Sequence, residues 1–184
     1  MKTKIKSAPA STSKTPVAQP PGAKAAKPKP LIPVRLKKIL VPADFSEESR
    51  KALHYAIALA SQFGASITLL YVFEPVPYPA DLGYGPAMLA VSNQDWEAKA
   101  LPKLKLMARP AIRAQVPVEL KIITGTAHHE ITTAAQTAKV DLIIMGTHGY
   151  SGFAHAMLGS TAEKVVRHAA CPVMVVRAHE HEFA

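Results

Sequence analysis

Five short apolar runs alternate with stretches of helical periodicity from Lys37 onward, and this alternation restricts the possible fold more than any other feature of the chain. Parallel strands need long crossover connections, which are usually helices. The sequence therefore predicts an α/β fold, a doubly wound five-stranded parallel sheet with right-handed crossovers. The five predicted strands are KKILVPAD, ASITLLYVFEP, PVELKIITG, VDLIIMG and CPVMVVR.

The first predicted helix, SEESRKALHYAIALASQFG, carries clear boundary signals. Ser46 is a candidate N-cap, two glutamates follow it at the positive end of the helix, and Gly64 can terminate it. The apolar stripe from Ala52 to Phe63 has the period of a helix and is predicted to face the sheet.

The second predicted helix, from Asn93 to Ala114, follows an irregular segment, PVPYPADLGYGPA. Pro102 and Pro110 are expected to break up its middle and its end. Two further helices are predicted in AHHEITTAAQTAK and STAEKVVRHAA.

The formal charge of +9 is distributed very unevenly. Ten of the 22 Lys and Arg residues precede the first acidic residue, Asp44, and the remaining 12 face all 13 acids. Residues 1–35, rich in Pro, Lys and Ala, are expected to be a disordered basic tail, with the folded domain over 36–178 and a flexible end over 179–184. The tail is predicted to act as a solvated linker, with weak contact to nucleic acid or acidic surfaces as the alternative.

The chain has no apolar run of the ~18 residues that a membrane span needs, and its tail lacks the apolar core of a secretory signal. No membrane partner is expected. The single cysteine, Cys171, rules out an intramolecular disulfide and suits a cytoplasmic protein, and it is predicted to be a small buried apolar residue.

The stretch GTHGYSGFAHAMLGST, from Gly146 to Thr161, follows the fourth predicted strand. Ligands of open parallel sheets bind beyond the carboxyl ends of the strands, where Asp44, Val72 and Gly146 are expected to meet if the strand order is 3-2-1-4-5. Glycine permits a sharp turn and close approach of backbone N–H groups, and Gly159-Ser160 is expected to open a helix whose N-terminus attracts anions. The glycine spacing fits neither the Walker pattern nor G-x-G-x-x-G.

The whole span from Lys37 to Arg177 resembles the universal stress protein family, in ILVPADFSEESRKAL, LLYV, IIMGTHG and LGSTAEKVVRHAACPVMVV. The G-x2-G-x9-G-[ST] spacing resembles the ATP-binding branch of that family. The resemblance implies the adenine nucleotide alpha hydrolase-like fold, a homodimer that pairs the last strands, Val173 to Val176, and a site for ATP, or for ADP or AMP, with Mg²⁺ as a possible companion. The site residues that it implies are Pro42, Ala43, Asp44, Val72, Gly146, His148, Gly149, Gly159, Ser160 and Thr161.

The chain departs from many relatives at Tyr150, where they carry Lys or Arg, and at Ala154-His155, where others have a basic pair. Plain structural explanations also exist for three of the implied residues. Ser160 through Glu163 reads as a capping box, Asp44 as an ordinary loop carboxylate, and Val72 as a core residue.

Neighbouring His128 and His129 point about 100° apart on a helix, so no metal site is expected there. No nucleophile-and-base set or carboxylate pair is apparent, and no catalytic residue is assigned. The leading functional hypothesis is a nucleotide-dependent stress-response regulator. The alternatives are a nucleotide-independent dimeric interaction protein and a slow ATPase or self-phosphorylating protein that positions phosphates near Ser160.

Overall fold

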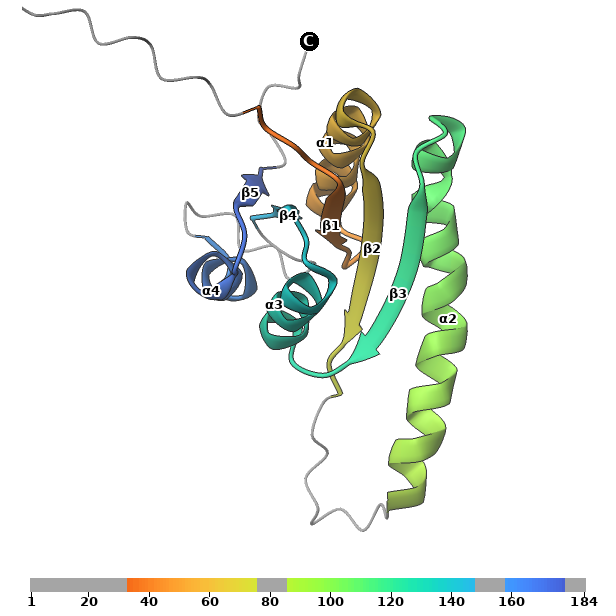
Figure 1. Ribbon diagram of the computed structural model, residues 1–184. Helices are drawn as coiled ribbons and strands as arrows, with labels where there is room; N and C mark the ends of the chain where they lie inside the picture. The colour runs from red at the N-terminus through yellow and green to blue at the C-terminus, as the bar shows by residue number, and fades with distance from the viewer. Residues whose placement is uncertain (1–32, 76–85, 148–157, 178–184) are drawn as a thin grey trace, which may run out of the picture. The chain divides into compact units, whose positions relative to one another are not determined.

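The computed structural model describes residues 33–75, 86–147 and 158–177, without the side chains of residues 86–95 (Figure 1). Every strand in this part of the chain belongs to one parallel sheet of five strands in the order β3-β2-β1-β4-β5. The predicted fold class and strand order are confirmed. The strands are β1 Lys38–Pro42, β2 Ser66–Phe73, β3 Val118–Thr124, β4 Leu142–Gly146 and β5 Val173–Val176.

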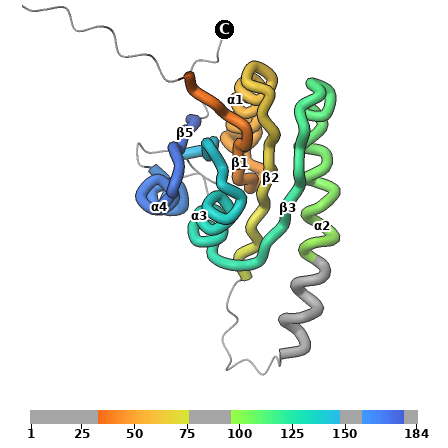
Figure 2. The backbone as a smooth tube through the Cα atoms, in the orientation of Figure 1, coloured from red at the N-terminus to blue at the C-terminus, as the bar shows by residue number. Residues whose placement is uncertain are grey.

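Two pairs of helices cover the sheet, and each pair has its own apolar cluster. One cluster joins α1, Glu47–Phe63, and α2, Pro86–Arg113, to strand residues such as Val41 and Leu69. The other joins α3, Ala127–Ala138, and α4, Ser160–His168, to the opposite faces of the same strands. The path of the backbone in Figure 2 shows the change of side between the first two helices and the last two. This change falls between the neighbouring strands β1 and β4, as a doubly wound fold requires.

The boundaries of α1 follow its local signals. The Ser46 side chain accepts a hydrogen bond from Ser49 N at 3.1 Å, and Gly64 ends the helix with φ of 67°. Both predictions are confirmed. The stripe from Ala52 to Ala60 is buried or packed against the core, but Phe63, its last member, is 40% exposed.

The helix α2 runs without interruption from Pro86 to Arg113, so the prediction that Pro102 and Pro110 break it is wrong. Both prolines lie on the exposed side of the helix. Each removes one backbone hydrogen bond, and the carbonyls that lose their partners belong to the exposed residues Ala98 and Leu106. Water can hydrate those carbonyls, which lowers the cost of each proline.

The chain enters the sheet through its central strand. Asp141, just before β4, accepts hydrogen bonds on Oδ2 from Lys37 N at 2.8 Å and from Lys38 N at 2.9 Å. The Lys38 ammonium in turn donates to the carbonyl of Ala138 at the end of α3. These contacts fix the start of β1 beside the start of β4.

Candidate functional site

Asp44 lies two residues beyond the carboxyl end of β1. Its Oδ1 accepts two hydrogen bonds from Ser46, one from the backbone N at 3.0 Å and one from Oγ at 2.5 Å. Ser46, which is buried, also caps α1, because its Oγ accepts a hydrogen bond from Ser49 N. The negative carboxylate therefore stands at the start of α1, where the positive end of the helix dipole also stabilises it.

Phe45, between these two residues, has the left-handed φ of 66°. Its ring packs against Tyr71 of β2 with centroids 4.9 Å apart, and Lys103 Nζ of α2 lies 5.7 Å from its centroid. Burial raises the pKa of Tyr71, and the negative charge of Asp44 raises it further. The end of β1 is thus surrounded by aromatic side chains on the side of the sheet that carries α1 and α2.

The end of β2 separates two environments. Val72 is half-buried and packs against the cluster under α3 and α4, whereas Phe73 stacks on Trp96 of α2 at 5.1 Å between centroids. Glu74 then turns toward α3, where its Oε1 accepts a hydrogen bond from Ala127 N. Val72 packs against the core, as its interpretation as a core residue predicted. It also lies at the end of β2, where the resemblance implies a nucleotide site.

Backbone hydrogen bonds tie the end of β4 to the start of α4. Of the residues that connect them along the chain, 148–157 lie outside the described part. Thr147 N donates to the carbonyl of Val176 in β5 at 2.9 Å, and Gly159 N donates to the carbonyl of Thr147 at 2.8 Å. The hydrogen bond from Gly159 to Thr147 therefore places the N-terminus of α4 at the carboxyl end of the sheet. Gly146 is the residue before Thr147.

The helix α4 begins at Ser160, and its N-cap is Gly159, with φ of −59° and ψ of 148°. The capping-box interpretation is wrong, because Ser160 stands one position inside the helix and the cap position has no side chain. The first three N–H groups of an α-helix, here those of Ser160, Thr161 and Ala162, have no carbonyl partner within the helix.

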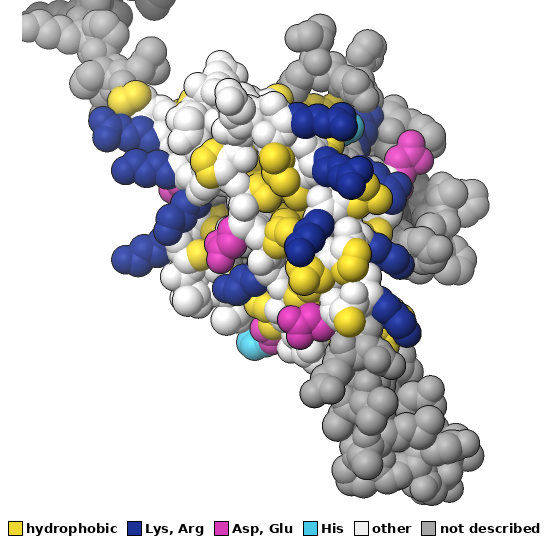
Figure 3. Space-filling model, turned by 90° about the vertical axis from the view of Figure 1, so that its right-hand side faces the viewer, with side chains coloured by type: hydrophobic (Ala, Val, Ile, Leu, Met, Phe, Trp, Pro, Cys, Tyr) yellow, Lys and Arg dark blue, Asp and Glu magenta, His cyan; other side chains and the backbone are white. Residues whose placement is uncertain are grey.

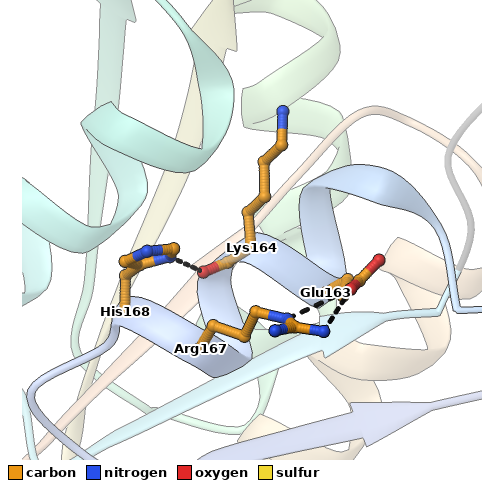
Figure 4. A network of polar contacts seen from close by, with 4 residues as sticks. All are labelled: Glu163, Lys164, Arg167 and His168. Carbon is orange, nitrogen blue, oxygen red and sulfur yellow. Dashed lines mark hydrogen bonds and ion pairs between the residues drawn. The ribbon is translucent and has the colours of Figure 1, made fainter.

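The only acidic residue in the first turn of α4 is Glu163, and its carboxylate is paired with Arg167. Arg167 Nη2 and Nε both donate to Glu163 Oε1, at 2.8 Å and 3.1 Å (Figure 4). His168 contacts the carbonyl of Lys164 and takes no part in that pair. A cation within the helix thus offsets the charge that would otherwise oppose an anion at the N-terminus.

The structure brings together two of the predicted groups. Pro42 ends β1, Ala43 and Asp44 follow it directly, and Gly146 ends β4, its neighbour in the sheet. Gly159, Ser160 and Thr161 begin α4 at the same edge of the sheet, while His148 and Gly149 lie outside the described residues. The sequence analysis missed Ser46 as the partner of Asp44, although aspartate two residues before serine is the local signal of an Asx turn.

Two further observations concern metal binding and the reactivity of the thiol. Among the described residues, no cluster of three or more His, Cys, Asp or Glu side chains is placed to hold a metal ion. Cys171 is half-buried against the cluster under α3 and α4, and burial raises the pKa of its thiol, with a smaller contribution from Asp141. A thiol of raised pKa is a weak nucleophile at neutral pH.

Known proteins resemble this chain over most of its length. A family model described as the universal stress protein family matches residues 35–177. A universal stress protein of Methanocaldococcus jannaschii is 34% identical over 149 residues, which cover 79% of this chain and 85% of that protein. The solved structure of a universal stress protein from Lactobacillus plantarum has a TM-score of 0.68 and 29% identity, and the match covers 79% of this chain and all of that one.

A third comparison concerns a protein solved with a bound ligand. A universal stress protein family member from Arabidopsis thaliana with AMP bound has a TM-score of 0.55 and 22% identity, over 77% of this chain and 91% of that one. At this identity, the comparison establishes a shared fold.

Proposed function

The chain belongs to the universal stress protein family, and we propose that it binds ATP, or another adenine nucleotide, at the carboxyl ends of β1 and β4. Nucleotide occupancy would make it a stress-response regulator. Support comes first from the arrangement of the two strand ends, which belong to neighbouring strands on either side of the point where the helices change faces. Ligands of open α/β sheets bind at this point.

One observation carries the proposal: the N-terminus of α4 has a glycine cap and an acid that is already paired. Gly159, at the cap position, has no side chain that could accept a hydrogen bond from the first N–H groups of the helix, and Arg167 offsets the charge of Glu163. Backbone N–H groups and the helix dipole at such an N-terminus attract phosphate. In the proposal, Ser160 and Thr161 add hydroxyl donors to these N–H groups.

The remaining predicted residues have assigned roles in this proposal. Pro42, Ala43 and Asp44 line the adenosine side, and Val72 contacts the base. Gly146, together with His148 and Gly149, surrounds the ribose and phosphates. At Tyr150 the chain lacks the Lys or Arg of many relatives. Mg²⁺ that accompanied ATP would neutralise part of the phosphate charge instead. The Arabidopsis protein with AMP bound shows that this fold can hold an adenine nucleotide.

Regulation would follow from differential binding. A ligand shifts a conformational equilibrium only if it binds one state better than another. Contacts from α4 and from the Gly146–Gly159 connection to the same phosphates would favour one arrangement of that connection. The surface offered to protein partners would then depend on the nucleotide.

Calorimetry with ATP, ADP and AMP, each with and without Mg²⁺, tests the binding proposal. We expect binding to the wild-type protein and its loss in Gly159→Val, whose branched side chain would occupy the space of the phosphate. The backbone angles of Gly159 suit any L-residue, so this variant should fold normally. Ala170→Val, at the other end of α4, is the matched control. Folded wild-type protein that gives no heat at high micromolar nucleotide would refute the proposal.

A second candidate function, nucleotide-independent dimerisation, is favoured by the position of β5. Val173–Val176 forms an edge strand of the sheet, and three of its four residues are only half-buried. An uncovered edge strand offers backbone groups that can pair with another chain. Light scattering after size exclusion should give a dimer, and Val175→Lys should convert it to a monomer. A dimer that persists in that variant would argue against pairing through β5.

A further inference from the structure

The outward side of α2 carries an apolar stripe that faces solvent. Pro102, Leu106 and Pro110 are exposed and follow one another at intervals of four residues, so they line up along one side of the helix. Leu106 is 58% exposed. The core contacts of α2 come from its other side, through residues such as Leu104 and Ala108, which are fully buried. The exposed stripe is therefore separate from the apolar side that holds α2 on the sheet.

Cations flank this stripe on both sides. Between residues 96 and 113 the helix has five Lys or Arg residues and one acid, Glu97. Helical geometry puts Lys99 and Lys103 along one flank and Lys105, Arg109 and Arg113 along the other. Figure 3 views the molecule from the side on which α2 lies, and shows dark blue basic side chains spread around yellow apolar ones.

We propose that this side of α2, the stripe and its flanking cations, is a docking surface for the headgroup region of an anionic lipid bilayer. The helix would lie parallel to the membrane plane. Leu106 and the two prolines would enter the interface, and Lys105, Arg109 and Arg113 would contact lipid phosphates. Lys99 and Lys103 lie over the rings of Trp96 and Phe45 and would add charge at the margin of the contact. Basic helices with apolar side chains on one side bind membranes in this way, at their surface.

The structure favours a bilayer over three other occupants. A second copy of the chain would bring the same five cations against each other, at a cost in repulsion. Nucleic acid would pair with the cations but gain little from an exposed leucine between them. A protein partner would need a pocket for the protruding Leu106 and acids fixed at matching positions. Lipid headgroups rearrange freely and can meet cations at any spacing.

The expectation of no membrane partner rested on the lack of a spanning segment, and a surface contact needs no such segment. Among the described residues, no helix combines the length and apolarity needed to cross a bilayer. A peripheral helix needs neither, because it buries only one side of itself in the interface. The ten cations that precede Asp44 in the sequence carry charge of the same sign and would strengthen attraction to an anionic surface.

Flotation of the full-length protein with vesicles tests the charge requirement. We expect binding to vesicles of phosphatidylcholine with about 30% phosphatidylglycerol, weakening as salt rises, and none to pure phosphatidylcholine. Each cation near an anionic surface strengthens binding about fivefold, so Lys105→Gln with Arg109→Gln should weaken it about 25-fold. Arg50→Gln with Lys164→Gln removes the same charge from α1 and α4 and should have a much smaller effect. Circular dichroism would establish that all three proteins have the same fold.

A third variant and a second probe separate this proposal from its alternatives. Leu106→Gln should weaken vesicle binding severalfold, because the apolar contact of Leu106 with the bilayer interface would be lost. It should leave any binding to a duplex DNA probe unchanged. No binding to anionic vesicles would overturn the proposal, and so would equal binding by the two charge variants or by Leu106→Gln. DNA binding that only the α2 charge variant loses, without vesicle binding, would assign the surface to nucleic acid instead.

Discussion

The helices α1 and α4 both begin at the edge of the sheet where the strands end, but they begin in different ways. The start of α1 is closed by its own chain: Ser46 caps it, and Asp44 holds Ser46 through two hydrogen bonds. The start of α4 has a glycine cap, and its first-turn acid is paired with Arg167. The difference supports a structural role for the first helix start, and in the proposed function the second is where phosphate binds.

The largest effect that would test this contrast is expected for Asp44→Ala. The substitution removes the acceptor of both Ser46 hydrogen bonds, and bonds to a charged group are worth about 1.5–3 kcal/mol each at most. We expect the free energy of unfolding to fall by about 2 kcal/mol in urea titrations. Asp44→Asn, which keeps an oxygen acceptor, should lose less. A free energy unchanged in Asp44→Ala would contradict the structural role given to the first helix start.

Ser160→Ala should give the opposite pattern at the second helix start. Ser160 lies inside the helix and not at its cap position, so we expect the free energy of unfolding to change by less than about 0.5 kcal/mol. Loss of one hydrogen bond to a charged phosphate should weaken ATP binding about tenfold in calorimetry. If stability falls and ATP affinity does not, the functional distinction between the two helix starts is wrong.

The pH dependence of stability offers a smaller effect, again at the first helix start. The pKa of Tyr71 is raised by burial and by Asp44, so the unfolded chain loses this proton more readily than the folded one. The contribution is fully present below about pH 10, the ordinary pKa of tyrosine, and is lost as pH rises through the higher pKa of the folded state. Stability measured between neutral pH and pH 11 should fall less steeply in Tyr71→Phe. An identical slope in both proteins would argue against a raised pKa of Tyr71 in the folded state.

The smallest expected effect is that of Glu163→Gln. The pair with Arg167 is exposed, so its loss should lower the free energy of unfolding by only about 0.3–0.5 kcal/mol. The substitution also removes a negative charge from the first turn of α4, and ATP affinity should therefore rise slightly, by less than about threefold. Thermal melts and calorimetry on the same samples would measure the two opposite changes. A fall in ATP affinity would show that Glu163 does not oppose the ligand.

The sequence predicted the sheet well because its signals are local and repeated. Strand runs, helix stripes and the caps at Ser46 and Gly64 each reflect a preference of a few neighbouring residues. The strand order was assumed rather than derived, because a doubly wound parallel sheet also allows other orders. The exact start of α4 was harder to predict. Whether Ser160 caps the helix or lies inside it depends on the backbone angles of Gly159, which the residue type alone does not determine.

The continuity of α2 could not be read from the sequence for a different reason. Proline normally ends a helix because a carbonyl loses its partner. The cost is low at Pro102 and Pro110, since both lie on the solvent side, and which side of the helix faces solvent is decided by the packing of Leu104 and Ala108 on the sheet. The Asp44–Ser46 contact was missed because both residues already had a separate interpretation, as a ligand contact and as a cap.

The tie between Asp141 and the backbone of Lys37 and Lys38 has a mechanical consequence. The N-terminal segment joins the sheet at β1, which is hydrogen-bonded to β2 on one side and to β4 on the other. If a partner held that segment and pulled on it along β1, the load would fall in shear on two strand pairings and on the Asp141 tie at once, whereas an edge strand has a single pairing to resist the same force. A pull along β1 would therefore meet more resistance than the same pull along an edge strand.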